Sequence, residues 1–305
     1  MKKFVFSIKT RYFCANFQSF FTLLLIIETI FRKNMTKKYG LLGHPLGHSF
    51  SRKFHNERFE RLGIDAEYVN FDLADIAQLP AVIASDQALL GLNVTIPYKQ
   101  QVMQFLDELD PLAERIGAVN TIVIRRSQGD AEVSGKIPGC WLRGYNTDII
   151  GFTDSITPLL QQAGLLDAHR QAITQDGQQP RALILGTGGA SRAVKVALED
   201  MGIVPVYVSR HAGQDRLTYA DLDTHIMQTH QVIVNCSPVG MFPHVDECPD
   251  IPYHLLTSGH VCYDLIYNPA ETLFLSRSKA QGAHVMSGGA MLEGQAIASY
   301  DYWTR

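Results

Sequence analysis

The sequence predicts an α/β protein built from two domains, each with a mainly parallel sheet. Strand patterns alternate with helix patterns along the chain, which is typical of parallel sheets. A glycine-rich turn at residues 186–189 joins a buried strand to a helix in the second half of the chain. With 305 residues, 46% of them hydrophobic, the chain is long enough to form two such cores.

The first half of the chain is expected to hold three strand–helix units and then a strand pair. Strand patterns cover residues 39–45, 66–73, 88–97, 118–126 and 139–146, and helix patterns cover 51–63, 76–85 and 100–117. Gly63 ends the first helix pattern, because glycine readily adopts the conformation that follows a helix. The third helix pattern rests on apolar residues at helical spacing, which are Val102, Phe105, Leu106 and Leu109.

The second half has the pattern of a Rossmann-type dinucleotide-binding domain, with one helix expected for each crossover. A helix pattern at 146–164 and a polar linker at 166–180 come before the strand at 181–185 and the glycine turn. The helix after this turn should bury Ala193, Val196 and Ala197. Later strand patterns cover 205–210, 231–238 and 260–267, and a C-terminal helix pattern covers 287–303.

These patterns predict a division of the chain into four parts. Residues 1–34 lie outside the fold, 35–147 form the first α/β domain, 148–287 form the dinucleotide-binding domain, and the helix within 288–305 returns to the first domain. The apolar run in the first part, Phe20 to Ile27, is shorter than the roughly 20 residues that span a bilayer. No signal-peptide cleavage site follows it. We therefore interpret Met35 as the start of the protein, with a membrane anchor in residues 1–34 as the alternative.

Charge and cysteine content exclude several classes of protein. The formal net charge of −3 gives no electrostatic footprint for nucleic acid. The five cysteines are scattered and form no CxxC pair, so neither a zinc site nor a disulfide framework is indicated. A cytoplasmic protein with no membrane partner for residues 35–305 is the expectation.

The glycine turn is the strongest local signal for a ligand. Gly186 and Gly188 allow a tight turn from strand to helix, and they let backbone N–H groups approach a pyrophosphate. The third position of the dinucleotide fingerprint holds Ser191, preceded by Gly189 and Ala190. A purely structural glycine turn is the alternative.

The end of the next strand indicates which dinucleotide is bound. NAD sites usually place Asp or Glu there, where the carboxylate accepts a hydrogen bond from the ribose. This chain instead has Ser209 and Arg210. A guanidinium can hold the 2′-phosphate of NADP, which a carboxylate would repel. A solvated surface arginine is the alternative.

A second junction combines hydroxyl and imidazole groups in the sequence HPLGHSFSRKFH at 44–55. A metal site needs ligands on one face together with a carboxylate, and these histidines have no HExxH-type spacing, so no metal is expected. Ser49 and Ser51 lie where a helix begins. They suit helix capping, and they also suit binding of a substrate carboxylate.

Lys99 and Asp148 each lie at a further strand–helix junction. A lysine near a helix start opposes the helix dipole, which favours anions there. Each residue alone has an ordinary explanation: Lys99 would be a solvent-exposed lysine, and Asp148 would cap a helix.

The motifs gain meaning from their order along the chain. After Met35 the chain carries HSxS, NVTxPxK, AVNT, NTD, GxGGASR, NxSPxGM, YDxxYNPxxTxFL and GGxMLxxQ in turn. This series resembles the shikimate dehydrogenase family over nearly the whole chain. The resemblance implies two α/β domains with the active site in the cleft between them. It also implies an oxidoreductase acting on a CH–OH group, which reduces 3-dehydroshikimate to shikimate with NADPH in the biosynthesis of chorismate and aromatic amino acids.

The resemblance also implies a role for individual residues. It makes Lys99 and Asp148 the catalytic pair. The implied substrate contacts are Ser49, Ser51, Thr95, Asn120, Tyr267 and Gln295. The implied contacts of the cofactor NADP are Gly186, Gly188, Gly189, Ala190, Ser209, Arg210, Leu265 and Gly288. The implied partner is a small-molecule substrate, and the implied assembly is a monomer or a homodimer.

This interpretation explains why a lysine follows the strand. Hydride transfer to a ketone leaves negative charge on its oxygen, which needs a proton or a cation close by. An aspartate from another junction can hold the ammonium in place across a cleft. The substrate carboxylate, held by hydroxyls at the far end, orients the ring for transfer.

The chain departs from the family pattern at a few positions, and two alternatives stay open. Arg52 replaces a proline after HSxS, Ile149 replaces a glycine after NTD, and only the arginine of an Asn-Arg-Thr triplet is kept at Arg210. One alternative is an NAD-preferring quinate/shikimate dehydrogenase, which Arg210 argues against. The other is a non-catalytic nucleotide-binding regulator, which the retention of Lys99 and Asp148 argues against.

Overall fold

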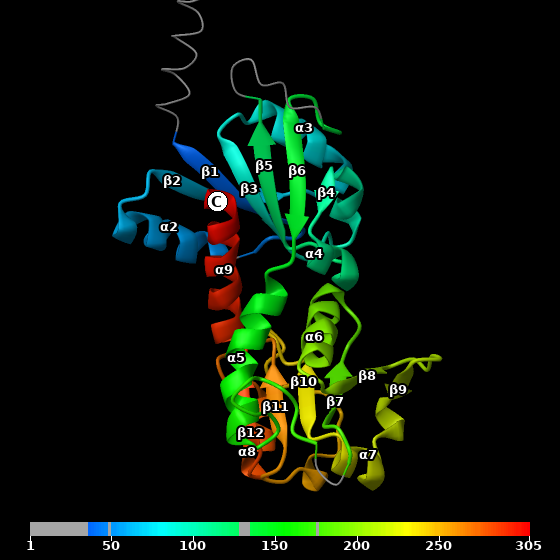
Figure 1. The fold of residues 1–305 in the computed structure, drawn as a ribbon. Helices are drawn as coiled ribbons and strands as arrows, with labels where there is room; N and C mark the ends of the chain where they lie inside the picture. Colours follow the sequence, from blue (N-terminus) through cyan, green and yellow to red (C-terminus); the bar gives the residue numbers. More distant parts are fainter. Residues whose placement is uncertain (1–35, 48–49, 128–134, 175–176) are drawn as a thin grey trace, which may run out of the picture.

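The computed structural model describes residues 36–47, 50–127, 135–174 and 177–305. Two six-stranded sheets lie at opposite ends of the molecule in Figure 1, and two long helices run between them. The interpretation of residues 1–34 and the role of Ser49 lie outside the described residues. Within the described ranges, no helix is both long and apolar enough to cross a membrane.

The first sheet is mixed and is built from the N-terminal strands. In spatial order its strands are β2 (Ala66–Asp72), β1 (Lys37–Gly43), β3 (Leu89–Val94), β5 (Thr121–Arg126), β6 (Cys140–Tyr145) and β4 (Glu108–Leu109). β1 pairs in parallel with β2 and β3, whereas β5 runs antiparallel to β3 and β6. The predicted strand pair is therefore confirmed.

The two faces of this sheet carry different cores. Helices α3 (Leu79–Ser85) and α4 (Pro111–Ile116) contribute to an aliphatic core on one face. Helix α2 (Phe50–Leu62) and the C-terminal helix pack on the other face around an aromatic cluster. The buried members of this aromatic cluster are Tyr39, Phe59, Tyr68 and Trp303.

The single helix predicted for residues 100–117 is wrong. This segment forms a 3-10 helix (Gln101–Phe105), the short strand β4 and helix α4. The Asp107 carboxylate accepts backbone N–H groups of Lys136 and Leu142 at 2.6 and 2.7 Å, which ties the segment to β6. Asp110 then caps α4 through the N–H of Leu112, just before the proline that starts the helix. These side-chain bonds override the helical spacing.

The second sheet is wholly parallel. Its spatial order is β12 (His284–Ser287), β11 (Val261–Asp264), β10 (Val232–Asn235), β7 (Arg181–Leu185), β8 (Val204–Ser209) and β9 (Arg216–Thr218). This is the Rossmann strand order, which reverses between β7 and β10. The predicted α/β class is confirmed, and such a reversal marks the edge where ligands bind.

Helices cover both faces of the second sheet. Helix α6 (Gly189–Asp200) buries Ala193, Val196 and Ala197 as predicted, and α7 (Thr224–Thr229) and α8 (Leu273–Ala280) cover the other face. The expectation of one helix for each crossover is wrong between β10 and β11. There the chain forms only the 3-10 helix Tyr253–Leu255.

Two long helices join the two sheets. Helix α5 (Asp148–Gln162) leaves the first sheet after β6 and packs along α9 (Gly289–Thr304), beside it in Figure 1. Gly151 allows this close packing, since a Cβ there would lie 2.3 Å from the Met291 carbonyl oxygen. The far end of α9 reaches the first sheet, where the Trp303 indole donates to the Ile122 carbonyl at 3.0 Å.

Candidate active site

Lys99 and Asp148 meet between the two sheets. Lys99 lies after the end of β3, and its carbonyl accepts the N–H of Val119 at 2.7 Å. Asp148 is the first residue of α5, where the helix dipole favours a carboxylate. The lysine ammonium lies 2.5 Å from Asp148 Oδ2, and the two side chains are only 14% and 7% exposed. The two residues predicted from the sequence thus form an ion pair in a largely buried position.

Asn120 holds the second oxygen of the same carboxylate. Its amide nitrogen donates to Asp148 Oδ1 at 2.9 Å, and its amide oxygen accepts the backbone N–H of Thr147 at 2.6 Å. Gln295 of α9 approaches the Asn120 nitrogen through Oε1 at 3.4 Å. Lys99, Asn120, Asp148 and Gln295 therefore form one cluster. Within it, Lys99 and Asn120 each hold one oxygen of the Asp148 carboxylate.

The other predicted substrate contacts lie on both sides of this cluster. Ser51 is buried on the first turn of α2, and Thr95 follows β3, with its N–H bonded to the Leu42 carbonyl at 2.8 Å. Tyr267, in the loop after β11, is 41% exposed, and its ring lies 5.7 Å from that of Phe50 on α2. The loop after β11 therefore reaches the helix that carries Ser51.

The glycine turn lies directly against the lysine. Gly186 adopts a left-handed φ of 106°, and Gly188 is the N-cap of α6, with no side chain capping that helix end. A Cβ on Gly189 would lie 3.3 Å from the Cβ of Lys99, so the turn and the lysine are in contact. Ala190 follows in the first turn of α6. The open helix N-terminus, rich in free N–H groups, suits a phosphate next to Lys99.

Leu265 and Gly288 pack backbone to backbone where β11 and β12 end. A Cβ on Gly288 would lie 2.1 Å from the Leu265 carbonyl oxygen, so only glycine fits there. The Gly288 N–H donates to the Ile266 carbonyl at 3.1 Å. This contact begins α9 and so sets the direction of the helix that carries Gln295.

A buried carboxylate fixes the loops on this edge of the sheet. Asp264 accepts hydrogen bonds from the Asn235 amide (3.0 Å), the Ile266 N–H (3.0 Å) and the Thr272 hydroxyl (2.6 Å). Burial raises the pKa of the Asp264 carboxyl to about 6. These bonds join the end of β10, the end of β11 and the start of α8, and they fix the loop that leads to Tyr267.

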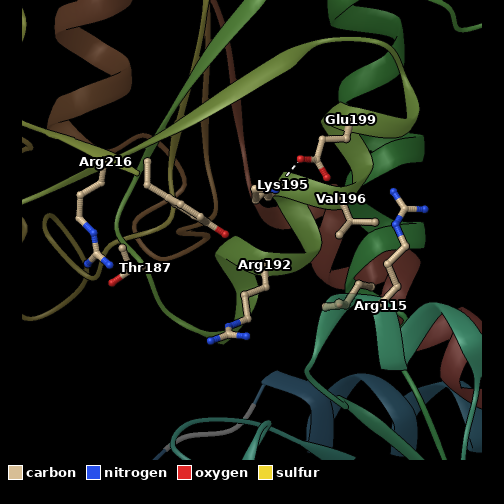
Figure 2. Close-up of a pocket in the computed structure, with 9 residues that line it drawn as sticks. Arg115, Thr187, Arg192, Lys195, Val196, Glu199 and Arg216 are labelled. Atoms are coloured by element: carbon tan, nitrogen blue, oxygen red, sulfur yellow. Dashed lines mark hydrogen bonds and ion pairs between the residues drawn. The ribbon is translucent and has the colours of Figure 1, made fainter. Parts of the chain in front are cut away.

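A cation-rich cavity lies beside the glycine turn, which the sequence alone did not reveal. It has a volume of about 520 Å³ and is lined by Thr187 of the turn and by arginines that include Arg192 and Arg216 (Figure 2). Two other cations of the lining, Arg115 and Lys195, are paired with carboxylates of α6. Within the described ranges, neither Arg192 nor Arg216 forms an ion pair with a carboxylate.

The two residues predicted to read the cofactor ribose lie at the end of β8. Arg210 is exposed, and the Ser209 hydroxyl donates to the His211 carbonyl at 2.6 Å. β8 also supplies Tyr207 to the lining of the cation-rich cavity. Among the described residues no cluster of His, Cys, Asp and Glu could hold a metal ion.

The site can be compared with known proteins. Residues 41–122 match the family model "Shikimate dehydrogenase substrate binding domain". A shikimate dehydrogenase (NADP(+)) of Desulforamulus reducens is 36% identical over 289 residues, which cover 88% of this chain and 90% of that protein.

Solved structures agree with the sequence relatives. A chorismate mutase/shikimate 5-dehydrogenase fusion protein from Clostridium acetobutylicum superposes with a TM-score of 0.71 at 32% identity, covering 88% of this chain and 91% of that one. A shikimate 5-dehydrogenase from Thermus thermophilus, solved with NADP(H) and shikimate, gives a TM-score of 0.68 at 29% identity. It covers 88% of this chain and 93% of the Thermus chain.

Proposed function

Because the chain belongs to the shikimate dehydrogenase family, we propose that it catalyses the reversible, NADP-dependent reduction of 3-dehydroshikimate to shikimate. It is an oxidoreductase of the route to chorismate and the aromatic amino acids. The observation that carries this proposal is the ion pair of Lys99 and Asp148, held at 2.5 Å in contact with the glycine turn.

The catalytic pair supplies the proton chemistry. NADP, when bound, supplies or takes up the hydride. In the direction of reduction, negative charge develops on the substrate oxygen, and the Lys99 ammonium donates a proton to it. Asp148 holds that ammonium in position, and Asn120 holds Asp148 through its other oxygen. Low exposure of the pair strengthens these electrostatic interactions.

The substrate is held at both ends. Ser49 and Ser51 bind its carboxylate, and Thr95, Asn120, Tyr267 and Gln295 contact its ring and hydroxyl groups. Support for this arrangement comes from the Asn120–Gln295 contact at 3.4 Å and from the approach of Tyr267 to α2. Fixing the ring at two ends turns the reaction into an oriented, effectively unimolecular step.

The glycine turn would hold the cofactor. Gly186, Gly188, Gly189 and Ala190 would bind its pyrophosphate, and Leu265 and Gly288 would contact its nicotinamide side. The turn fits such a group, because a Cβ on Gly188 would meet nothing within 4 Å, which leaves open space there. Ser209 and Arg210 read the 2′-phosphate, and we add Arg192 and Arg216, whose guanidinium groups line the neighbouring cavity.

Two alternatives were open from the sequence. An NAD-preferring quinate/shikimate dehydrogenase is disfavoured, because the end of β8 carries Arg210 and the adjoining cavity is rich in cations. A non-catalytic regulator is disfavoured, because Lys99 and Asp148 form a buried ion pair beside the glycine turn.

The organisation of the chain is part of the proposal. We propose a substrate domain at 35–147, an NADP domain at 148–287 and a C-terminal helix within 288–305 that returns to the first sheet. The two separate sheets and the Trp303–Ile122 bond support this division. We also propose a cytoplasmic monomer or homodimer. All cysteines within the described ranges are free thiols, which suits a reducing compartment.

Cofactor reduction by the purified full chain tests the function. The rate of NADPH formation is measured with shikimate and with quinate, each against NADP+ and NAD+. The expected result is highest kcat/KM for shikimate with NADP+. Comparable or higher kcat/KM with NAD+ and quinate would support the first alternative, and no turnover with any pair would support the regulator.

A further inference from the structure

Ser299 of α9 carries a fully buried hydroxyl that the mechanism above does not use. The residue is 0% exposed and lies one helical turn after Gln295. Its hydroxyl donates to the backbone carbonyl of Gln295 at 2.8 Å. No sequence motif pointed to Ser299, because a serine within a helix pattern is an ordinary residue. Its other hydrogen bonds, however, leave the helix and reach the first sheet.

The Ser299 hydroxyl joins three elements that lie outside its own helix. The amide nitrogen of Asn93, on β3, donates to it at 2.8 Å. The hydroxyls of Thr121, at the start of β5, and of Thr147, just before α5, lie 2.8 and 3.0 Å from it. These three partners are themselves at most 4% exposed. The serine hydroxyl therefore lies where α9 meets both the first sheet and the start of α5.

Donor counting gives the direction of these bonds. A hydroxyl has one proton and can accept two hydrogen bonds. The Gln295 carbonyl can only accept, so the bond to it uses the serine proton. Asn93 presents its amide nitrogen, since that nitrogen also donates to the backbone carbonyl of Asn120 at 3.3 Å. Ser299 is thus a donor within its own helix and an acceptor for a group of the first sheet.

The position of the Gln295 side chain depends on where this turn of α9 lies. Its amide nitrogen donates to the Leu292 carbonyl of the same helix at 2.9 Å, and its amide oxygen lies 3.4 Å from the Asn120 nitrogen. The contact with Asn120 is too long to fix the side chain firmly. Asn120 has a stronger anchor of its own, since its amide oxygen accepts the backbone N–H of Thr147 at 2.6 Å. A change at Ser299 should therefore move Gln295 more than Asn120.

We propose that Ser299 is a positioning residue for Gln295, and that it fixes the turn of α9 that presents this side chain to the substrate. Ser299 is the nearest acceptor of the Asn93 amide nitrogen, whose bonds to Asn120 and Thr121 are both 3.3 Å long. A shift of α9 would break this shorter bond inside a buried cluster, where a lost partner is not replaced by water. The inference rests on the proposed role of Gln295 as a substrate contact.

The test compares Ser299→Ala with a matched control in the full chain. Ser278→Ala removes the same group from α8, where Ser278 is also 0% exposed and its hydroxyl also donates to the carbonyl four residues earlier at 2.8 Å. We expect Ser299→Ala to raise the KM for shikimate about threefold to tenfold, since roughly one hydrogen bond to the substrate is weakened. The kcat and the KM for NADP+ should stay within about twofold. Ser278→Ala should change none of the three.

Thermal melts show that a loss of stability does not explain the result. Both variants lose a buried hydroxyl, so both should melt at a lower temperature than the wild type, but only Ser299→Ala should have a changed KM. KM does not depend on the folded fraction of the enzyme. If Ser299→Ala does not fold, Ser299→Cys gives the same test, because a thiol is of similar size but forms only weak hydrogen bonds.

A double variant tests whether Ser299 acts through Gln295. If it does, the double variant of Ser299→Ala and Gln295→Ala should have the same KM for shikimate as Gln295→Ala alone. An unchanged KM in Ser299→Ala, equal changes in the two serine variants, or additive effects in the double variant would overturn the inference. An unchanged KM in Gln295→Ala would overturn it as well, because Ser299 would then have no substrate contact to position. A folded wild type that does not turn over shikimate would instead overturn the proposed function.

Discussion

The role proposed for Lys99 and Asp148 depends on their contact with each other. Neither residue type is unusual where it occurs, and the sequence identified them only through a series of motifs. The residues that hydrogen-bond around this pair were harder to predict, because sequence periodicity does not tell which buried polar groups face one another. Tyr68, Thr121 and Ser299 lie within ordinary strand and helix patterns, yet they are fully or nearly fully buried and hydrogen-bonded. Arg192 and Arg216 were missed for a similar reason, since only the fold brings them to one cavity.

A first prediction at the residue scale concerns cofactor selection. Arg210→Ala should raise the KM for NADP+ about tenfold to a hundredfold, because a charge-assisted hydrogen bond to phosphate contributes roughly 1.5–3 kcal/mol. The KM for NAD+ should barely change. Steady-state kinetics with both cofactors give the answer, with Arg125→Ala on β5 as a control for the loss of an exposed arginine. If the variant still prefers NADP+ over NAD+, recognition of the 2′-phosphate would be assigned to Arg192 or Arg216 instead.

A second prediction concerns the acid stability of the first sheet. His55 is fully buried, and among the described residues neither of its ring nitrogens has a hydrogen-bond partner. Burial, with a smaller effect from Arg58, lowers its pKa to about 3. Between about pH 6.5 and 3, His55 binds a proton in the unfolded chain but stays neutral in the folded chain. Stability is therefore lost as pH falls through this range, by roughly 2–3 kcal/mol at about pH 4.5.

His55→Phe should remove this acid-dependent loss. The variant keeps an aromatic ring against Tyr68 but cannot titrate. Urea unfolding of both proteins at about pH 7 and about pH 4.5 measures the effect. The free energy of unfolding should fall less for the variant than for the wild type between the two pH values. If the free energy of unfolding falls equally in the wild type and in His55→Phe, groups other than His55 control unfolding by acid.

At the scale of elements, the sequence predicted most strands and the long helices, because their periodicity and end signals agree. Gly63 and Gly164 end their helices with left-handed φ values of 63° and 72°. The prediction of a single helix after Lys99 was wrong, because Asp107 and Asp110 accept hydrogen bonds from backbone N–H groups, which helical spacing cannot reveal. The short strands β9 and β12 were also missed, since each has too few residues to express a pattern.

A prediction at this scale concerns the junction of β12 and α9. Gly288→Ala would place a Cβ 2.1 Å from the Leu265 carbonyl oxygen, so the backbone must move. We expect a loss of about 1–3 kcal/mol in the free energy of unfolding and a raised KM for NADP+. Gly289→Ala is the matched control, since its Cβ would meet nothing within 4 Å. Equal behaviour of the two variants in thermal melts and kinetics would contradict the close packing.

At the scale of the whole molecule, the proposed reaction centre is assembled from both sheets. Lys99 comes from the first sheet, the glycine turn that touches it comes from the second, and Asp148 begins the helix that joins them. α9 adds Gln295 after running back along α5. The sequence could predict the two folds separately, but the meeting of these groups depends on how α5 and α9 pack the sheets together.

The most direct test of this account is a four-enzyme cycle on Lys99 and Asp148. The kcat and KM for shikimate are measured for the wild type, Lys99→Ala, Asp148→Asn and the double variant, with thermal melts to establish folding. Lys99→Ala should lower kcat by about 10²–10⁴ and change KM much less, because the proton donor is lost while the substrate contacts remain. The double variant should be little worse than the worse single variant, because residues that act as a unit are not additive. A folded Lys99→Ala enzyme with normal kcat would contradict the account.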